Sequence, residues 1–364
     1  MKSDLDLFNL LITKLGLQRK TYKILKRFNT FFLENKLIKL NLSGLGLTWL
    51  PEIIYKFKKL EKLDLSNNQI EKIGTKINEL QNLSYLNLQS NFLVDLPEEL
   101  FNLSKLKYLD LGRNFLKSVS EGIKRLQEIQ DLNLIHNKLI FLPKTLASLI
   151  SLKRLSLRSN KLVELPENIG VLKNLTYMNL QDNHLETLPE SIGNLIKLKR
   201  LDLRSNRLIL LPEDLGRLID LERIELSMNN LTKLPESLGN LSNLKELGLY
   251  HNYLEELPES IRNLNNLEIL NLEYNNLKKL PEGISELGKL SELKLNQNYL
   301  TELPKGFYRL NKLQFLNLSQ NSIKVIPQSL ENLTNLRVLN IEKNKDIKVG
   351  IKAKNLPNLE RFEK

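Results

Sequence analysis

The chain has no cysteine, which excludes disulfides, thiolate nucleophiles and cysteine-ligated metal sites. The motifs GxxxxGK[ST], GxGxxG, HExxH and GxSxG are also missing. Only three histidines are present, His136, His184 and His251, and they lie too far apart in the sequence to converge on one metal ion. The best acid–base pair, His251 with Glu273, is an exposed contact of a kind that is more often incidental than catalytic. We therefore expect no enzyme activity, no cofactor and no metal site.

Long apolar runs are missing as well. No stretch approaches the ~18 apolar residues of a membrane-spanning helix. Residues 1–20 carry Asp4, Asp6 and Lys14 among their apolar residues and lack a small-residue cleavage site, unlike a secretory signal. Together with the absence of cysteine, these features predict a soluble, cytoplasmic protein.

Positive charge is in excess, but it is concentrated at the two ends of the chain. The formal net charge is +12, and residues 1–36 and 343–364 together supply nine of these twelve charges. The remainder is nearly balanced. This distribution does not provide the long basic groove that nucleic acid requires, so nucleic acid is not the expected partner.

What the sequence does contain is one pattern repeated along most of its length. The most regular example is the segment 198–220, LKRLDLRSNRLILLPEDLGRLID, after which Leu221 restarts the pattern. The segment has Asn206 at its ninth position, Pro212 at its fifteenth, and apolar residues at positions 1, 4, 6, 11, 14, 18 and 21. The period is therefore 23 residues, which is typical of a stacked leucine-rich array.

Each repeat has two halves. The LxxLxL half alternates like a strand with one buried face, whereas the LPxxLxxL half has the spacing of a short helical or 3₁₀ turn. A solenoid grows in one dimension, so we expect one domain, with residues 1–36 as N-terminal cap, 37–358 as fourteen repeats and 359–364 as C-terminal tail. The repeats begin at Leu37, Leu60, Leu83, Leu106, Ile129, Leu152, Leu175, Leu198, Leu221, Leu244, Leu267, Leu290, Leu313 and Leu336.

Two columns of the repeat have structural causes. Asparagine occupies the ninth position of every repeat except the first, where Leu45 stands. An inward asparagine offers one acceptor and two donors, so we expect it to bond backbone groups of its own coil and of the neighbouring coil. Eleven of the twelve prolines occupy the fifteenth position, where a fixed φ and a missing N–H suit the start of the turn. In the last repeat Asp346 takes an apolar position, which indicates that the coil is deforming into a cap.

The N-terminal segment follows a different pattern. Ser3 and Asp6 have capping-box spacing, and apolar residues at helical spacing follow until Gly16, which predicts a first helix. A second apolar stripe predicts another helix before Lys36. We expect both helices to cover the open end of the first coil. The second stripe consists of Leu25, Phe28 and Phe32, flanked by Tyr22 and Phe31.

Residues 19–27, RKTYKILKR, leave an alternative open. They are basic and partly amphipathic, as helices that bind anionic surfaces are. Binding of an anionic membrane or of nucleic acid through this segment is therefore a competing prediction. Capping would occupy its aromatic side, which favours the structural role.

From Leu37 onward the chain resembles the intracellular leucine-rich repeat class, with the unit LxxLxLxxNxLxxLPxxIxxLxxL, found in Ras-suppressor-like scaffolds, Roco-protein recognition domains and many bacterial proteins. The opening segment 40–52, LNLSGLGLTWLPE, and the closing segment 356–362, LPNLERF, are similar to the end units of such arrays. The resemblance implies an α/β horseshoe with a concave parallel β-sheet, convex short helical or 3₁₀ turns and a helical N-terminal cap. It also implies that partners are recognised on the concave face. No GTPase, kinase or ubiquitin-ligase motif accompanies the array, so the resemblance names no partner.

Function is expected at the strand positions that the repeat leaves free, namely positions 3, 5, 7 and 8. Neighbouring strands lie ~4.8 Å apart, so one position in successive repeats forms a ladder of side chains. Tyr85 and Tyr108 are ladder neighbours at position 3, and Phe92 and Phe115 are neighbours at the edge. This aromatic zone supplies candidate binding anchors, although mutual stacking explains it equally well.

Two charged zones follow along the same ladders. The basic zone suits carboxylate or phosphate groups, although nearby acidic residues can neutralise much of it. The next zone is acidic and aromatic, and for this zone a solvated strand face without a ligand is the alternative interpretation. The basic zone comprises Arg154, Arg158, Tyr177, Arg200, Arg204 and Arg223. The acidic zone comprises Glu246, Tyr250, His251, Glu273, Tyr274 and Glu292, with Tyr253 and Tyr299 toward the edge.

These patterns predict a monomeric, non-enzymatic protein–protein interaction module that binds a protein ligand on its concave face, as a scaffold, an adaptor or a regulator of signal transduction. Two alternatives stay open: attachment to an anionic membrane or nucleic acid through residues 19–27, and a secreted bacterial effector that recognises a host protein.

Overall fold

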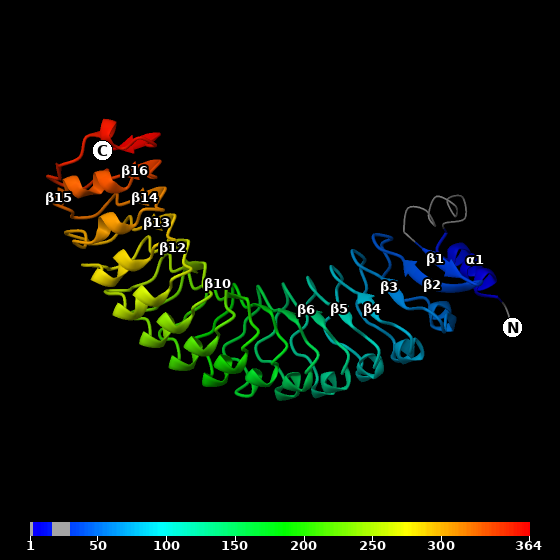
Figure 1. Ribbon diagram of the computed structural model, residues 1–364. Helices are drawn as coiled ribbons and strands as arrows, with labels where there is room; N and C mark the ends of the chain where they lie inside the picture. Colours follow the sequence, from blue (N-terminus) through cyan, green and yellow to red (C-terminus); the bar gives the residue numbers. More distant parts are fainter. Residues whose placement is uncertain (1–2, 17–29) are drawn as a thin grey trace. The chain divides into compact units, whose positions relative to one another are not determined.

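The computed structural model describes residues 3–16 and 30–364, and the chain forms two compact units, residues 1–162 and 163–364. Each unit is a stack of 23-residue coils. Strands line one side of the stack and 3₁₀-helices line the opposite side (Figure 1). We call the strand side the strand face, and it is the side that the sequence predicts to be concave.

In the first unit, short strands form a parallel ladder in which each residue pairs with the residue 23 positions later, as Tyr85 does with Tyr108. This register follows from the constant repeat length, because an insertion in any coil would shift every later strand. The strands are β2 (Lys36–Asn41), β3 (Lys62–Asp64), β4 (Tyr85–Asn87), β5 (Tyr108–Asp110), β6 (Asp131–Asn133) and β7 (Arg154–Ser156).

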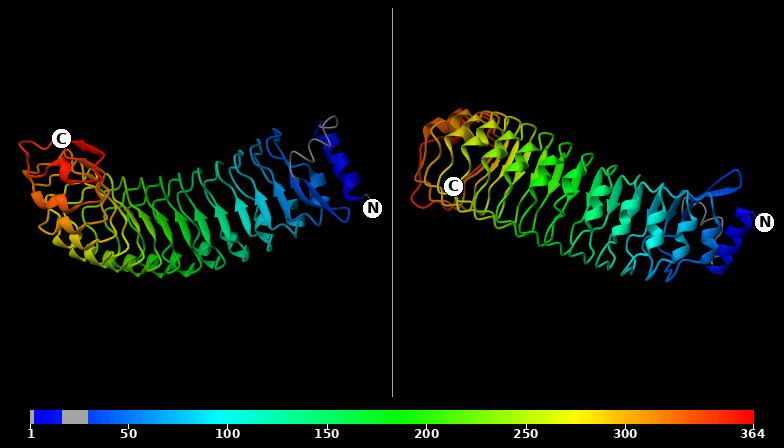
Figure 2. Two further views of the ribbon diagram at one scale, coloured as in Figure 1. Left: turned by 45° about the horizontal axis from the view of Figure 1, so that its top comes forward. Right: turned by 90° about the horizontal axis from the view of Figure 1, so that it is seen from below.

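The second unit continues the same register in its own parallel ladder, whose strands are drawn as arrows in the left view of Figure 2. The strands are β8 (Tyr177–Asn179), β9 (Arg200–Asp202), β10 (Arg223–Glu225), β11 (Glu246–Gly248), β12 (Ile269–Asn271), β13 (Glu292–Lys294), β14 (Phe315–Asn317), β16 (Val338–Asn340) and β18 (Arg361–Glu363).

The opposite side of each stack consists of 3₁₀-helices, which lie side by side in the right view of Figure 2. Proline at position 15 caps most of them, and Pro212 has the expected φ of −69°. The first unit has η2 (Glu52–Lys56), η3 (Thr75–Glu79), η4 (Glu98–Asn102), η5 (Glu121–Arg125) and η6 (Lys144–Ser148). The second has η7 (Ile169–Val171), η8 (Glu190–Asn194), η9 (Glu213–Arg217), η10 (Glu236–Asn240), η11 (Glu259–Asn263), η12 (Glu282–Glu286), η13 (Phe307–Arg309), η14 (Gln328–Asn332) and η15 (Ala353–Asn355).

The repeated leucines form a continuous core inside each stack, and nearly all of them are fully buried. The asparagine column has the predicted role. The Asn206 amide donates to the carbonyls of Leu180 and Leu203 at 3.0 Å each, and its oxygen accepts from the Leu185 N–H at 3.1 Å. Leu180 and Leu185 belong to the preceding coil, so each asparagine joins two coils.

The first predicted helix is confirmed as α1 (Asp4–Lys14). Ser3 and Asp6 form the capping box, and Gly16 ends the helix with a left-handed φ of +66°. Asp4 is buried, and its carboxylate accepts the backbone N–H of Leu37 at 2.8 Å. That bond attaches α1 to the first strand of the parallel ladder.

The second predicted helix is wrong over its described part, and residues 17–29 lie outside the described residues. Phe31–Leu33 is β1, an edge strand antiparallel to β2. The connecting residues Glu34 and Asn35 have φ of 46° and 59°, which a tight hairpin turn requires. Alternation along β1 allows Phe32 to pack edge to face on Phe8, with ring centres 5.6 Å apart, while its two neighbours are exposed. The same residues also fit helical spacing, which misled the sequence interpretation.

The end of the second unit also differs from expectation. Residues 361–363, predicted as part of a tail, pair with β16 as β18. A separate two-stranded ladder joins β15 (Val325–Ile326) to β17 (Lys348–Val349). Asp346 is exposed with φ of 59°, so the last repeat does turn a polar residue outward where earlier repeats bury leucine. Within residues 3–16 and 30–364, no helix is long and apolar enough to cross a bilayer.

Candidate functional site

The backbone just after each strand has an unusual conformation. Thirteen residues at position 8 of the repeat have φ between 50° and 57°, a left-handed region that favours glycine, asparagine and aspartate. Only Asn67 and Asp182 in this column are residues of that kind. The fold therefore imposes this conformation on whichever residue stands at position 8, and His136 and His251 are of a type that adopts it more readily than most.

The aromatic zone of the first unit is a stacked pair. The rings of Tyr85 and Tyr108 are 4.4 Å apart and nearly parallel, at 4°. Burial raises the pKa of both phenols above 10, and the neighbouring carboxylate of Asp110 raises that of Tyr108 further. The two rings use much of their flat surface on each other, which favours the stiffening role over the anchor role.

Below this pair lies a carboxylate that the sequence interpretation missed. Asp110 is buried and accepts hydrogen bonds from the Tyr108 hydroxyl at 3.1 Å, the Gly112 N–H at 2.9 Å and the Asn133 amide at 2.9 Å. Three donors compensate for the burial of its charge. The sequence does place Asp110 among the polar residues at position 5 of the repeats. However, the repeat period does not show which of these polar residues is buried.

Phe92 and Phe115 lie at the edge of the first unit, with ring centres 6.0 Å apart, and both are exposed. The Lys138 ammonium lies over the Phe115 ring at 4.7 Å from its centre. A cation at that distance is attracted to the ring face. This edge therefore remains an accessible aromatic surface.

The predicted basic zone falls on both units, and each part is largely neutralised. In the first unit the Arg154 guanidinium is 3.3 Å from the Asp131 carboxylate. Burial raises the pKa of Asp131, although Arg154 opposes that rise. Arg158 lies at position 7 of the same repeat, close to the end of this unit.

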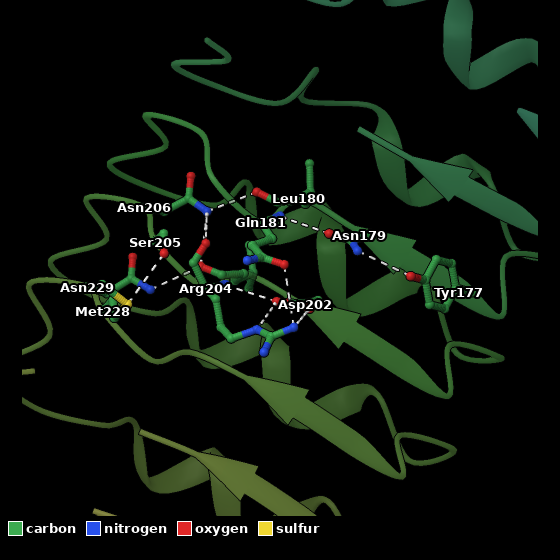
Figure 3. Close-up of polar contacts among 11 residues, drawn as sticks. Tyr177, Asn179, Leu180, Gln181, Asp202, Arg204, Ser205, Asn206, Met228 and Asn229 are labelled. Carbon is green, nitrogen blue, oxygen red and sulfur yellow. Dashed lines mark hydrogen bonds and ion pairs between the residues drawn. The ribbon is translucent and has the colours of Figure 1, made fainter. Parts of the chain in front are cut away.

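In the second unit Arg204, two residues after the end of β9, forms a two-pronged bond with Asp202, the last residue of that strand (Figure 3). Its Nε is 3.0 Å and its Nη2 is 2.6 Å from the two carboxylate oxygens. This bond raises the pKa of Arg204. Tyr177 lies on β8, where its hydroxyl accepts the Asn179 amide at 3.2 Å. The fork fixes the Arg204 guanidinium in one orientation on the strand face.

Arg223 on β10 forms an ion pair with Glu246 on β11. That pair joins the predicted basic zone to the predicted acidic zone. Arg200 is exposed, and within the described residues its side chain has no bonded partner. The surrounding carboxylates of Asp182, Asp202 and Glu225 equal in number the three arginines that the predicted basic zone has in this unit, Arg200, Arg204 and Arg223. The zone is therefore charge-balanced rather than basic.

Glu225 is one of the acidic residues that the sequence places beside the basic zone, and the structure gives its carboxylate a contact that the sequence did not predict. Its Oε2 lies where a side chain at residue 248 would stand, because a Cβ added to Gly248 would be 2.1 Å from it. Burial raises the pKa of Glu225, although the Arg204 and Arg223 cations oppose that rise. Glycine at a strand position, here the last residue of β11, was the available signal, since it marks close approach of another group.

The acidic and aromatic zone has a compact aromatic cluster at its centre. The ring centres of Tyr250 and Tyr274 are 5.3 Å apart, and that of His251 is 5.7 Å from Tyr250 and 6.0 Å from Tyr274. The carboxylate of Glu273 is half-buried and unpaired within the described part of the chain, and the His251 ring packs on the tyrosines instead. In that same part, no three His, Asp or Glu side chains are arranged to hold a metal ion.

Beside this cluster lies a groove of about 440 Å³, which we call the tyrosine groove. Tyr253, Tyr274 and Tyr299 line it and are 50%, 42% and 59% exposed. The sequence places Tyr253 and Tyr299 at the edge but does not reveal that the groove exists. The other lining residues are His251, Asn252, Asn275, Asn276, Gln297, Asn298 and Gln320.

Fold and surface together define the class: a solenoid repeat protein whose parallel ladder presents free side chains in a fixed register. A model of the leucine-rich repeat region matches residues 142–248 and 232–364, and further leucine-rich repeat models match residues 81–139 and 59–83. The chain belongs to the leucine-rich repeat proteins.

Solved structures of leucine-rich repeat proteins resemble it over most of its length. One is a protein of Leptospira interrogans, 32% identical, with a TM-score of 0.74, covering 88% of this chain and 94% of that one. Another is the Arabidopsis receptor kinase HAESA, in complex with the peptide hormone IDA and the co-receptor SERK1, at 31% identity and a TM-score of 0.75. That match covers 92% of this chain and 59% of the receptor chain. Curated protein sequences gave no match.

Proposed function

We propose that this protein is a non-enzymatic interaction module that binds a protein partner on its strand face, as a monomeric scaffold or signalling regulator in the cytoplasm. The leucine-rich repeat fold supports a protein-interaction role in general, and HAESA is a relative of this fold in complex with a peptide and a protein. The absence of cysteine supports a reducing compartment.

The observation that carries the proposal is the order of the strand face in the second unit. Arg204 and Arg223 are held by carboxylates and the Tyr250 cluster is packed, whereas Arg200 on β9 and Glu273 just after β12 have no bonded partner in the described residues. Paired residues keep the surface rigid, while unpaired charges of opposite sign are available to a partner. A preorganised surface loses little conformational entropy on binding. Opposite charges along one face favour a protein with a complementary pattern.

A charge-swap experiment tests this function. The double variant Arg200→Glu with Glu273→Lys keeps the net charge and reverses the pattern of the strand face. We expect it to lose the partner recovered by affinity purification with the wild-type protein, with affinity lower by at least about tenfold. The matched control is Lys279→Glu with Glu256→Lys, two exposed residues of the second unit that line a groove among the 3₁₀-helices. Equal recovery by both double variants would refute strand-face binding.

Attachment through residues 19–27 is the competing function, and those residues lie outside the described part of the chain. Replacing Arg19, Lys20, Lys23, Lys26 and Arg27 with glutamine in the same purification separates the two. If this variant alone loses all partners, the result favours binding of an anionic membrane or of nucleic acid through residues 19–27. The effector alternative differs only in the origin of the protein partner.

A further inference from the structure

The tyrosine groove is a hollow that three exposed tyrosines line, just after the strands of the second unit. Its lining includes no lysine, arginine, aspartate or glutamate, in contrast to the strand face beside it. An uncharged groove of tyrosines and side-chain amides suits an uncharged ligand that has flat apolar rings and free backbone carbonyls.

The spacing of the lining residues is held by the backbone. The N–H groups of Tyr253, Asn276 and Tyr299 each donate to a carbonyl of the preceding coil at 2.9 Å. Coils bonded in this way are ~4.8 Å apart, as strands are. Tyr253 and Tyr299 are two coils apart, so their attachment points repeat at about 9.6 Å with Asn276 midway.

That spacing selects among regular peptide conformations. A polyproline II helix has three residues per turn and rises about 9.3 Å, close to the two-coil distance. A β-strand repeats at about 6.7 Å and an α-helix at about 5.4 Å, and neither matches one coil or two. A polyproline II segment running along the groove would therefore present equivalent residues to Tyr253 and Tyr299.

The chemistry of the groove agrees with this geometry. Polyproline II has no internal hydrogen bonds, and proline lacks an N–H, so the ligand offers carbonyl acceptors only. Asn276 supplies an amide donor between the two tyrosines. Gln297 is already bonded to Gln320 at 2.8 Å, which fixes the floor of the groove next to Tyr299. The apolar faces of tyrosine rings pack on proline rings, as in the aromatic-lined grooves that dock proline-rich segments.

We propose that the tyrosine groove binds an uncharged, proline-containing segment in the polyproline II conformation, carried by the protein partner. This inference rests on the proposed function, because it assigns one subsite within protein binding. Tyr253 and Tyr299 pack on the proline rings, and Asn276 donates to a ligand carbonyl.

The test uses the full-length protein and fluorescein-labelled twelve-residue peptides, followed by fluorescence anisotropy. The probes are polyproline, an alternating glycine–serine peptide and a helical peptide of the EAAAK type. We expect polyproline to bind with the highest affinity of the three. The double variant Tyr253→Ala with Tyr299→Ala should weaken its binding at least about tenfold. Asn276→Ala should weaken it by about fivefold, through loss of one hydrogen bond.

Tyr308→Ala is the matched control, because Tyr308 is an exposed tyrosine on η13. It should leave polyproline binding unchanged, and circular dichroism of all variants should equal that of the wild type. Absence of polyproline binding at millimolar peptide, equal binding of the glycine–serine peptide, or equal loss in Tyr308→Ala would overturn the proposal. The charge-swap experiment uses residues outside the groove, so failure here leaves the strand-face function standing.

Discussion

Asn206 shows how one side chain can hold two coils together. Its amide satisfies two carbonyls and one N–H that the turn out of the strand leaves without ladder partners. The same three bonds recur with Asn229 and its neighbouring coils. The asparagine column is therefore a structural requirement of the fold and carries no information about ligands.

Asn206→Ala is expected to lower the free energy of unfolding by about 3 kcal/mol, because it leaves buried backbone groups unpaired. Urea denaturation followed by circular dichroism measures this. The control is Asn230→Ala, an exposed asparagine at the edge of the next repeat, with an expected change below about 0.5 kcal/mol. Equal losses in the two variants would contradict the structural role of the column.

The carboxyl group of Glu225 makes the free energy of unfolding depend on pH. Burial raises its pKa above the ordinary 4.5, so the folded protein binds the proton more tightly than the unfolded chain does. This contribution to stability is fully present below pH 4.5 and is lost as the pH rises through the raised pKa. The substitution Glu225→Gln removes the cost of ionising this buried carboxyl. The stability of the variant relative to wild type should therefore increase from pH 4 to pH 7.

In the control variant, Glu222→Gln, the expected change in stability between pH 4 and pH 7 has the opposite sign. The hydrogen bond from Lys245 lowers the pKa of Glu222, so Glu222 favours the folded state above its ordinary pKa. Glu222→Gln should therefore lose stability relative to wild type from pH 4 to pH 7. Urea titrations at the two pH values measure both variants. Parallel changes in the two would show that burial of Glu225 does not control its titration.

At the scale of elements, close packing of η8, η9 and η10 depends on glycine. A Cβ on Gly193 in η8 would lie 2.1 Å from the backbone oxygen of Asp214 in η9. Likewise, a Cβ on Gly216 would lie 2.2 Å from the backbone oxygen of Ser237 in η10. Because the obstacle is backbone, it cannot move aside by rotating a side chain, and the distance between neighbouring helices is set by these glycines.

Gly193→Ala is expected to destabilise the protein by about 2 kcal/mol, since the added methyl group must push two helices apart. The comparison is Gly288→Ala, where the added Cβ meets nothing within 4 Å and φ is not left-handed. That variant should be neutral or stabilised by up to about 1 kcal/mol through the unfolded state. Thermal unfolding of both reports the difference, and a stable Gly193→Ala would contradict the packing argument.

At the scale of the molecule, the distribution of charge separates protein partners from polyanions. The net charge of +12 comes mainly from the two ends, and Arg204 and Arg223 of the second unit are paired with carboxylates. A surface of this kind attracts a patterned partner over a short range and does not condense a long polyanion.

The affinity for the protein partner should therefore change by less than about threefold between 50 and 200 mM salt, whereas a protein with six to ten phosphate contacts loses about 10³–10⁵. Titration of the purified partner at several salt concentrations measures the slope. A labelled 20-base-pair duplex at 150 mM salt provides the comparison, and no binding is expected. A steep slope together with duplex binding would favour residues 19–27 as the functional segment.

The sequence by itself determined the coil. A strict period of 23 residues predicts which leucines are buried, where strands and 3₁₀-helices begin, and why asparagine and proline recur, because each answers a local requirement of the backbone. It also predicted α1 through its capping box. It could not distinguish a helix from a hairpin at Phe31–Leu33, because aromatic residues fit both spacings and the turn at Asn35 decided between them.

Only the tertiary structure decided how the free side chains are used. The period shows that Arg223, Glu225 and Glu246 are neighbours, but Arg223 pairs with Glu246, while Glu225 extends over Gly248. Likewise, the sequence places Tyr253 and Tyr299 at one edge, and the fold forms a groove between them. The physical reason is that repeat spacing is set by backbone hydrogen bonds, which every coil shares. The choice among side-chain partners depends on burial and competition, which differ from coil to coil.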